Sequence, residues 1–202
     1  MKKILFVSDG IFHPPLPAQR SLRRIITEQK GYTVSHIRSL ERLPGTLNTF
    51  SAVVIYLHHK NISQEALSSL DDFISAGGGL LGVHSATASF KQTPHYFEIL
   101  GGRFIGHGQV ENFTVKPAEN PTIFGAIPGF DVVDELYLHE CQPDIEVHFT
   151  TEYEGEEVPV VWTHTYGKGR ICYACPGHRT GSMKNETYQK ILQRGLDWVT
   201  DR

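Results

Sequence analysis

The sequence is poor in cysteine, in basic blocks and in long apolar runs, and each shortage excludes a class of protein. Three cysteines in 202 residues do not supply the disulfide framework of a small secreted domain. The formal net charge is −3 and no lysine–arginine cluster stands out, so nucleic acid and anionic membranes are not expected partners. The N-terminal apolar run stops at Val7, too early for a signal peptide or a membrane span. We therefore expect a cytoplasmic protein.

Linkers, internal repeats and low-complexity tracts are also lacking. Hydrophobic residues make up 40% of the chain, and its length allows a full core without metal or disulfide staples. We therefore expect a single domain over residues 1–202. Cys172 and Cys175 form a C-x-x-C pair within a strand-like run, where residues three apart point to opposite faces. We interpret both as buried thiols rather than as metal ligands.

The first half of the chain alternates strand and helix patterns. Helical periodicity follows Pro17 until Gly31, and again follows Ser63, a good helix cap, until Gly77. Apolar runs of strand length lie between these segments, at residues 3–9, 32–37, 51–57 and 80–84. Strands that alternate with helices through short loops predict a parallel α/β sheet.

The second half has a different pattern. A short helix is expected within residues 95–104, and residues 119–130 read as a loop rich in proline and glycine. A final amphipathic helix should begin near Asn185. Strands are expected at residues 112–118, 146–153, 158–166 and 171–175, with the middle two antiparallel.

The stretch GGGLLGVHSA, residues 77–86, has the layout of a nucleophile elbow, in which a strand enters a sharp turn and lifts one side chain above the sheet. Small residues must flank the apex, and Gly82 and Ala86 satisfy that need two positions on either side. The apex is His84, so an imidazole stands where a nucleophile is usual. The alternative is an ordinary tight turn followed by a core histidine.

Several of the eleven histidines follow the ends of predicted strands. They are His13, His58, His59, His84 and His178. In an open α/β sheet, ligands bind beyond the carboxyl ends of the strands, where side chains from separate strands converge. The joint placement therefore favours a functional cluster over isolated loop histidines.

Two imidazoles that face each other can act as general acid and base, or can bind a divalent metal such as zinc with help from a carboxylate. We predict His84, His178 and Glu135 as catalytic residues, although the DELY stretch around Glu135 could also be a solvated acidic loop. His107 lies in the glycine-flanked GHG stretch and can approach a ligand closely. Metal ligation is expected of His84, His107 and His178.

The remaining candidates would bind the substrate. Trp162 and Tyr137 could supply the aromatic face on which a sugar stacks, although Trp162 lies in a strand-like alternation and could instead be core. The full set of predicted substrate-binding residues is His13, His58, Ser85, His107, Tyr137 and Trp162.

Five motifs together make the sequence recognisable. They are GGGLLGVHSA, ILGGRFIGHG, DELY, VPVVWTHTYGKGRICYACPGH and GLDW. In this order they resemble the ThuA-like (trehalose utilisation) family, an offshoot of the class I glutamine amidotransferase fold. The resemblance implies a flavodoxin-like three-layer α/β sandwich with a mainly parallel central sheet and an antiparallel extension, and a role in the catabolism of trehalose or a related sugar. The family usually has a histidine where this chain has Asn120.

The likeness to glutamine amidotransferases implies that their glutamine-hydrolysing activity has been lost in this chain. His84 holds the position of their elbow cysteine, and His178 matches the histidine of their triad. Thr180 stands where their orienting glutamate would be. Without a thiolate no thioester can form, so glutamine hydrolysis is not expected.

Two functions from different classes remain open on the sequence. One is an enzyme that processes a sugar or an oxidised sugar derivative by acid–base or metal-assisted chemistry. The other is a non-catalytic module that binds a sugar or a partner on a degenerate amidotransferase scaffold, because a fold does not fix a function. Either would bind a small molecule, and a homodimer is compatible with both.

Overall fold

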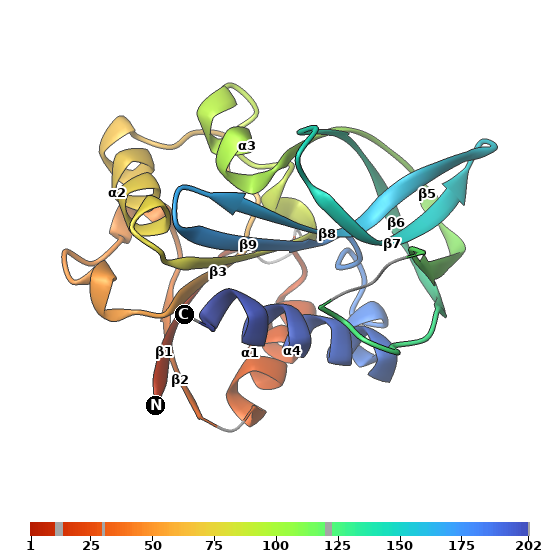
Figure 1. Ribbon diagram of the computed structural model, residues 1–202, viewed down its shortest axis with the longest axis horizontal. Helices are drawn as coiled ribbons and strands as arrows, with labels where there is room; N and C mark the ends of the chain where they lie inside the picture. Colours follow the sequence, from red (N-terminus) through yellow and green to blue (C-terminus); the bar gives the residue numbers. More distant parts are fainter. Residues whose placement is uncertain (11–13, 30, 120–122, 202) are drawn as a thin grey trace.

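The computed structural model describes residues 1–10, 14–29, 31–119 and 123–201. His13 and Asn120 therefore lie outside the described residues. The strands form one mixed sheet in the order β2-β1-β3-β4-β9-β8-β7-β5-β6 (Figure 1). Four neighbouring pairs are parallel and four are antiparallel, so the sheet is mixed and consists of a parallel half and an antiparallel extension of equal numbers of pairings.

The parallel half of the sheet follows the first half of the chain. Its strands are β1 (Lys2–Ser8), β2 (Tyr32–Ile37), β3 (Ala52–Tyr56), β4 (Gly79–Val83) and β9 (Gly169–Ala174). Every residue of β3 and β4 is buried, as expected for parallel strands covered on both faces. Because these strands are parallel, their carboxyl ends lie at one edge of the sheet.

Helices cover both faces of this parallel half (Figure 1). They are α1 (Leu16–Glu28), α2 (Gln64–Ser75), α3 (Pro94–Leu100) and α4 (Glu186–Thr200). Helices α1 and α4 lie on one side of the sheet, and α2 and α3 lie on the other. The predicted caps are present, because the Ser63 side chain accepts from the N–H of Ala66 and the Asn185 side chain accepts from the N–H of Tyr188. None of the described helices is both long and apolar enough to cross a membrane.

The antiparallel extension contains the remaining strands, which lie between residues 102 and 166. They are β5 (Gly102–Pro117), β6 (Phe130–Cys141), β7 (Glu146–Tyr153) and β8 (Glu156–Tyr166). Although β6 is last in the strand order, the extension curls back toward the parallel half. The N–H of Tyr137 on β6 lies 3.4 Å from the sulfur of Cys175, which directly follows β9. This curl brings two distant parts of the sheet to one place.

Two elements of the extension differ from the sequence-based expectation. Strand β5 begins directly after α3 and includes the GHG stretch, so His107 lies on a strand rather than in a glycine loop. Irregularities in the β5–β6 register, between Phe104 and Gly106 and between His107 and Val110, break the simple alternation of a strand. The DELY stretch is also a strand, because it lies within β6, and the solvated-loop alternative is wrong.

Candidate functional site

The elbow at the end of β4 has a strained backbone. His84 opens a short 3₁₀ turn, His84–Ala86, with a φ of +44°, an uncommon value for a residue with a Cβ. Two buried hydroxyls bind its carbonyl oxygen. The Tyr173 hydroxyl donates to it at 2.9 Å and the Thr87 hydroxyl at 3.2 Å. Strain of this kind persists only where surrounding contacts hold it, and such strain is frequent at functional sites.

His139 on β6 completes the network below the elbow. Its Nε2 atom lies 3.0 Å from the Thr87 hydroxyl and 3.2 Å from the Tyr173 hydroxyl. Burial lowers the pKa of His139 to about 3, so the ring is neutral at physiological pH. The extension thus supports the elbow from below. The sequence did not reveal this contact, because nothing local marks His139 as a partner of Thr87.

Three contacts fix the ring of His84. Its Nδ1 atom donates to the carbonyl oxygen of Cys175 at 2.9 Å, because a carbonyl can only accept. The Tyr137 ring lies 4.0 Å away between centroids, at a tilt of 31°. A Cβ at Gly177 would lie 2.5 Å from the Cβ of His84, so only glycine fits there without a shift. In a neutral ring with Nδ1 protonated, Nε2 presents its lone pair to the rest of the cluster.

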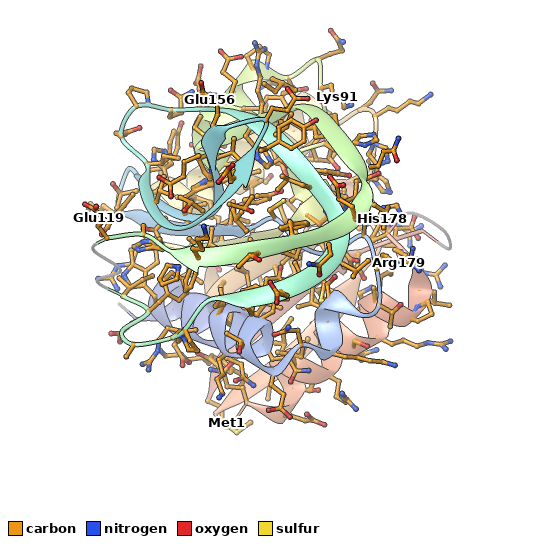
Figure 2. The ribbon with its side chains drawn as sticks, turned by 90° about the vertical axis from the view of Figure 1, so that its right-hand side faces the viewer. Met1, Lys91, Glu119, Glu156, His178 and Arg179 are labelled. Carbon is orange, nitrogen blue, oxygen red and sulfur yellow. The ribbon has the colours of Figure 1, made fainter. Side chains whose placement is uncertain are left out.

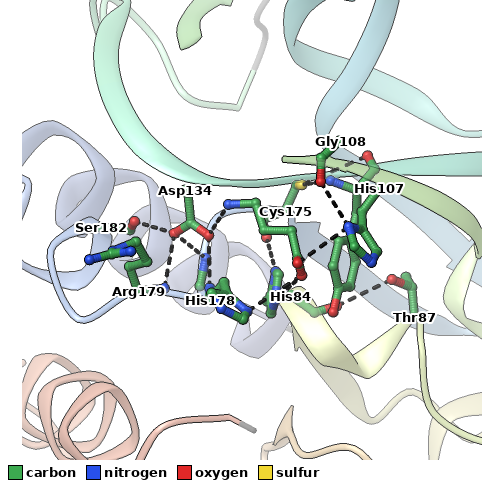
Figure 3. Close-up of polar contacts among 12 residues, drawn as sticks. His84, Thr87, His107, Gly108, Asp134, Cys175, His178, Arg179 and Ser182 are labelled. Carbon is green, nitrogen blue, oxygen red and sulfur yellow. Dashed lines mark hydrogen bonds and ion pairs between the residues drawn. The ribbon is translucent and has the colours of Figure 1, made fainter. Parts of the chain in front are cut away.

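The cluster gathers around Glu135, and Figure 3 labels its three histidines, His84, His107 and His178. The Oε2 atom of Glu135 lies 3.9 Å from Nε2 of His84 and 3.4 Å from Nδ1 of His178. Its Oε1 atom lies 3.3 Å from Nδ1 of His107. The side chain of Glu135 is only 12% exposed, whereas those of His178 and His107 are 29% and 49% exposed. The three predicted catalytic residues therefore converge, with His84 innermost.

The donor set is suited to a metal ion. One ligand atom each from His84, Glu135 and His178 lie within 4.8 Å of one another. Two imidazoles and one carboxylate are ligands that zinc and similar divalent ions accept. His107, the third expected ligand, is not in this set. Its Nδ1 atom donates to the carbonyl oxygen of Gly108 at 2.8 Å and lies 3.3 Å from Oε1 of Glu135. Glu135 thus replaces His107 in the candidate metal-ligand set of the described residues.

A buried carboxylate, Asp134, positions the loop that carries His178 (Figure 3). It accepts from the backbone N–H of Gly177 at 3.0 Å and of His178 at 2.9 Å. It also accepts from the Ser182 hydroxyl. Burial raises the pKa of Asp134, and these hydrogen bonds oppose that rise. Because Asp134 precedes Glu135 on β6, one dipeptide supplies the carboxylate of the cluster and anchors the histidine loop.

The other predicted residues are distributed unevenly around the cluster. His58 is exposed at the end of β3, and Tyr137 covers His84 directly. Ser85 is fully buried. Trp162 is also fully buried, where its ring packs against Tyr173 and its indole N–H donates to the Leu100 carbonyl. The interpretation of Trp162 as a sugar-stacking face is therefore wrong.

The C-x-x-C cysteines are buried structural residues, as the sequence indicated. Both thiols are inaccessible to solvent, and burial raises the pKa of Cys172 to about 12. Burial also raises the pKa of Cys175, whose sulfur faces the backbone of Tyr137. Protonated buried thiols are poor nucleophiles, so neither replaces the cysteine of an amidotransferase elbow.

Fold and site together define an α/β protein with a histidine–carboxylate centre at the ends of its parallel strands. The model of one family, ThuA (trehalose utilisation), matches residues 3–199 of the chain. The chain therefore belongs to the ThuA family. No curated protein matches it by sequence.

Solved structures with the same fold include close shape matches of low sequence identity. A ThuA-like protein from Parabacteroides merdae ATCC 43184 superposes with a TM-score of 0.84 at 18% identity, covering 99% of this chain and 90% of that one. A ThuA-like protein from Bacteroides uniformis ATCC 8492 gives 0.82 at 15% identity, covering 98% and 91%. A cytoplasmic protein from Salmonella typhimurium LT2 gives 0.77 at 16% identity, covering 98% and 99%. At these identities the likeness shows the fold alone.

Proposed function

We propose that this chain is an enzyme of carbohydrate catabolism, acting on trehalose or a related sugar derivative, with His84, Glu135 and His178 as its centre. The convergence of these three side chains on one another at the strand ends carries the proposal. Family membership supports the choice of a sugar as substrate. Within this proposal the fold is of the flavodoxin-like three-layer type, in a single domain.

The orientation of His84 favours a metal-assisted site. Its Nδ1 proton is committed to the carbonyl of Cys175, so a neutral ring directs a lone pair toward the carboxylate of Glu135. Two electron-rich groups that face each other are stabilised by a cation between them. A divalent ion held there would polarise a hydroxyl or carbonyl oxygen of the substrate.

Proton transfer would fall to the more exposed members of the cluster. His178 has a partly exposed ring, and its Nδ1 atom contacts the same carboxylate oxygen as His84 does. An imidazole in contact with a carboxylate can give or take a proton near neutral pH. We assign His178 as general acid or base and Glu135 as the group that orients it. The protein would have no glutaminase activity, because the elbow has no thiol.

One observation favours the rival function, a non-catalytic sugar-binding or partner-binding module. His84 is fully buried and the Tyr137 ring lies against it, so a substrate reaches the apex only if Tyr137 moves. An enzyme that uses His84 needs this movement of Tyr137, whereas a module that binds its ligand outside the Tyr137 ring does not. For either function we propose that the protein acts in the cytoplasm. A structural neighbour described as a cytoplasmic protein supports this location.

Elemental analysis of untagged protein, with zinc titration calorimetry, tests the metal-assisted centre. We expect about one divalent ion per chain in the wild type and a large loss of zinc affinity in Glu135→Gln, which keeps the shape and removes the charge. Glu140→Gln is the matched control, because Glu140 is an exposed glutamate on the same strand.

Turnover is then followed by mass spectrometry on trehalose, maltose and their oxidised derivatives, with wild type, His84→Ala and His178→Ala. Conversion that depends on both histidines supports the enzyme. Sugar binding without conversion supports the module. Neither ion nor sugar binding would contradict the proposed function.

A further inference from the structure

A second strained residue lies beside the elbow. Among the described residues with a Cβ, only His84, Phe90 and Glu154 have a positive φ, and Glu154 belongs to the tight β7–β8 turn. Phe90 has a φ of +54° and is buried. Its N–H donates to the carbonyl of His59 at 2.8 Å, which ties this segment to the end of β3. His84 and Phe90 thus lie within one short stretch, at the same edge of the sheet.

The next residue, Lys91, is exposed and extends over an aromatic ring of β5. Its Nζ atom lies 4.3 Å above the ring of Phe104. The Phe104 ring contacts Tyr137 at 4.5 Å, and Tyr137 contacts His84 at 4.0 Å. A series of ring contacts, one edge-on and one tilted, therefore connects the ammonium group to the elbow. Figure 2 places Lys91 and His178 on the face where β5 and β6 lie.

The charge of Lys91 is not neutralised locally. In the part of the chain that the structure describes, no carboxylate lies within 4 Å of its ammonium group. His58 and Lys91 are the chain neighbours of His59 and Phe90, which are joined by a backbone hydrogen bond of 2.8 Å. Burial and then the positive charges of Lys91, His59 and Lys60 lower the pKa of His58. Asp9 faces His59 at 3.5 Å and partly offsets that imidazole alone. Lys91 thus presents a positive charge, with the imidazole of His58 as a neighbouring hydrogen-bonding group, on the β3 side of the cluster.

Acidic and basic residues are distributed unevenly along the chain. Residues 102–166, the antiparallel extension, contain two lysines or arginines against twelve aspartates or glutamates, whereas the rest of the chain contains seventeen against ten. The net charge of −3 conceals this separation. The cluster lies at the junction, with Glu135 on the acidic side and Lys91 on the basic side. A ligand that spans the junction meets a carboxylate at one end and an ammonium group at the other.

We propose that Lys91 and His58 form an anion-binding subsite of the centre described above, and that the substrate is a sugar derivative bearing a carboxylate or phosphate group. The inference rests on the proposed function, because it names the substrate class of the same site. Lys91 donates N–H groups to the anion while its aliphatic stem stays on Phe104. The hydroxyl-bearing end of the ligand then lies toward Glu135 and His178.

Calorimetric titration with sodium gluconate, glucose 6-phosphate, glucose and trehalose tests the subsite. We expect one of the two anions to bind at least tenfold tighter than glucose, and Lys91→Met to remove about tenfold of that advantage without weakening neutral sugars. Lys91→Arg should retain most of it. Lys168→Met is the control, because Lys168 is an exposed lysine in the β8–β9 turn, at the opposite end of the sheet. The comparison of gluconate with glucose 6-phosphate tells a carboxylate from a phosphate.

The outcomes separate this inference from the proposed function. Binding of neutral sugars that needs His84 but shows no preference for anions, or an unchanged preference in Lys91→Met, overturns the subsite and leaves the centre intact. Failure of all four ligands to bind overturns both. Equal losses of anion affinity in Lys91→Met and Lys168→Met would show that the anion is attracted by positive charge in general rather than by Lys91 in particular. That result would also overturn the subsite.

Discussion

The parallel half and the antiparallel extension contribute different parts of the same centre. The parallel half supplies His84 on its elbow and His178 after its last strand, both held by backbone geometry. The extension supplies Glu135, and with Asp134 and His139 it holds those histidines in place. Neither region has a complete centre. The comparison shows how a set of added strands can complete a site. The antiparallel extension curls back onto the carboxyl-end edge of the parallel strands and adds the carboxylate of Glu135 to the histidines of that edge.

Removal of Asp134 should have the largest effect, because it breaks the anchor between the two regions. Asp134→Ala leaves buried N–H groups of the Gly177–Arg179 loop without an acceptor. We expect a loss of about 3 kcal/mol in the free energy of unfolding, measured by urea denaturation. Asp131→Ala, at an exposed position of the same strand, should cost far less. Equal losses in the two variants would show that the loop does not depend on Asp134.

Acid should weaken the junction through His139. Its pKa is about 3 in the folded protein and near 6.5 in an unfolded chain, so the stabilisation is complete above pH 6.5 and is lost as the pH falls toward 3. One such group gives a slope of about 1.4 kcal/mol per pH unit over that range. His139→Phe should flatten the curve of unfolding free energy between pH 6 and 4. An unchanged slope would argue that His139 is protonated in the fold.

Crowding of the elbow should disturb the site more than it disturbs the fold. In Gly177→Ala the new Cβ overlaps the Cβ of His84, and we expect a cost of about 1.5 kcal/mol. Binding of zinc should weaken strongly, because the ring of His84 must move. Gly181→Ala is the control, since its Cβ would meet nothing within 4 Å and its φ of −58° suits any residue. Normal zinc binding in Gly177→Ala would remove His84 from the ligand set.

The smallest effect is expected within the parallel half, from a surface ion pair with the opposite pH dependence. His95 on α3 contacts Asp71 on α2 at 2.6 Å and Glu98 at 2.9 Å, and these hydrogen bonds, Asp71 first, raise its pKa. The stabilisation is complete below pH 6.5 and is lost as the pH rises through the raised value. Because the groups are partly exposed, we expect less than about 1 kcal/mol.

Melting temperatures at pH 6 and pH 9, for wild type and His95→Gln, measure this effect. The difference between the two proteins should shrink at pH 9. A difference that grows with pH would contradict the assignment of His95 as the cation of this pair.

The parallel half could be predicted from the sequence in some detail, whereas the extension could not. Ser63 and Asn185 cap their helices as predicted, and a sharp turn follows β4 at His84 as its small neighbours indicated. Strand β6 was missed, because a buried aspartate occupies a position where the alternation calls for an apolar residue. Strand β5 was read too short, because bulges near His107 interrupt its periodicity.

The same division holds within the site. His84, His178 and Glu135 were identified as candidates from strand ends and family motifs. The distances between them, the burial of Trp162 and the anchoring role of Asp134 could not be predicted from the sequence. The replacement of His107 by Glu135 among the candidate metal ligands also needed the structure, because it depends on which ligand atoms the fold brings close to one another.

The sequence by itself determined the alternation of strands and helices, the caps, and the histidine at the elbow, because each depends on residues within one or two turns of chain. The tertiary structure decided that β6 returns to the elbow, that Asp134 faces a loop 43 residues away, and that acidic and basic regions meet at the centre. Those outcomes depend on strand order, register and curl, which arise from the packing of the whole sheet and leave no local pattern in the sequence.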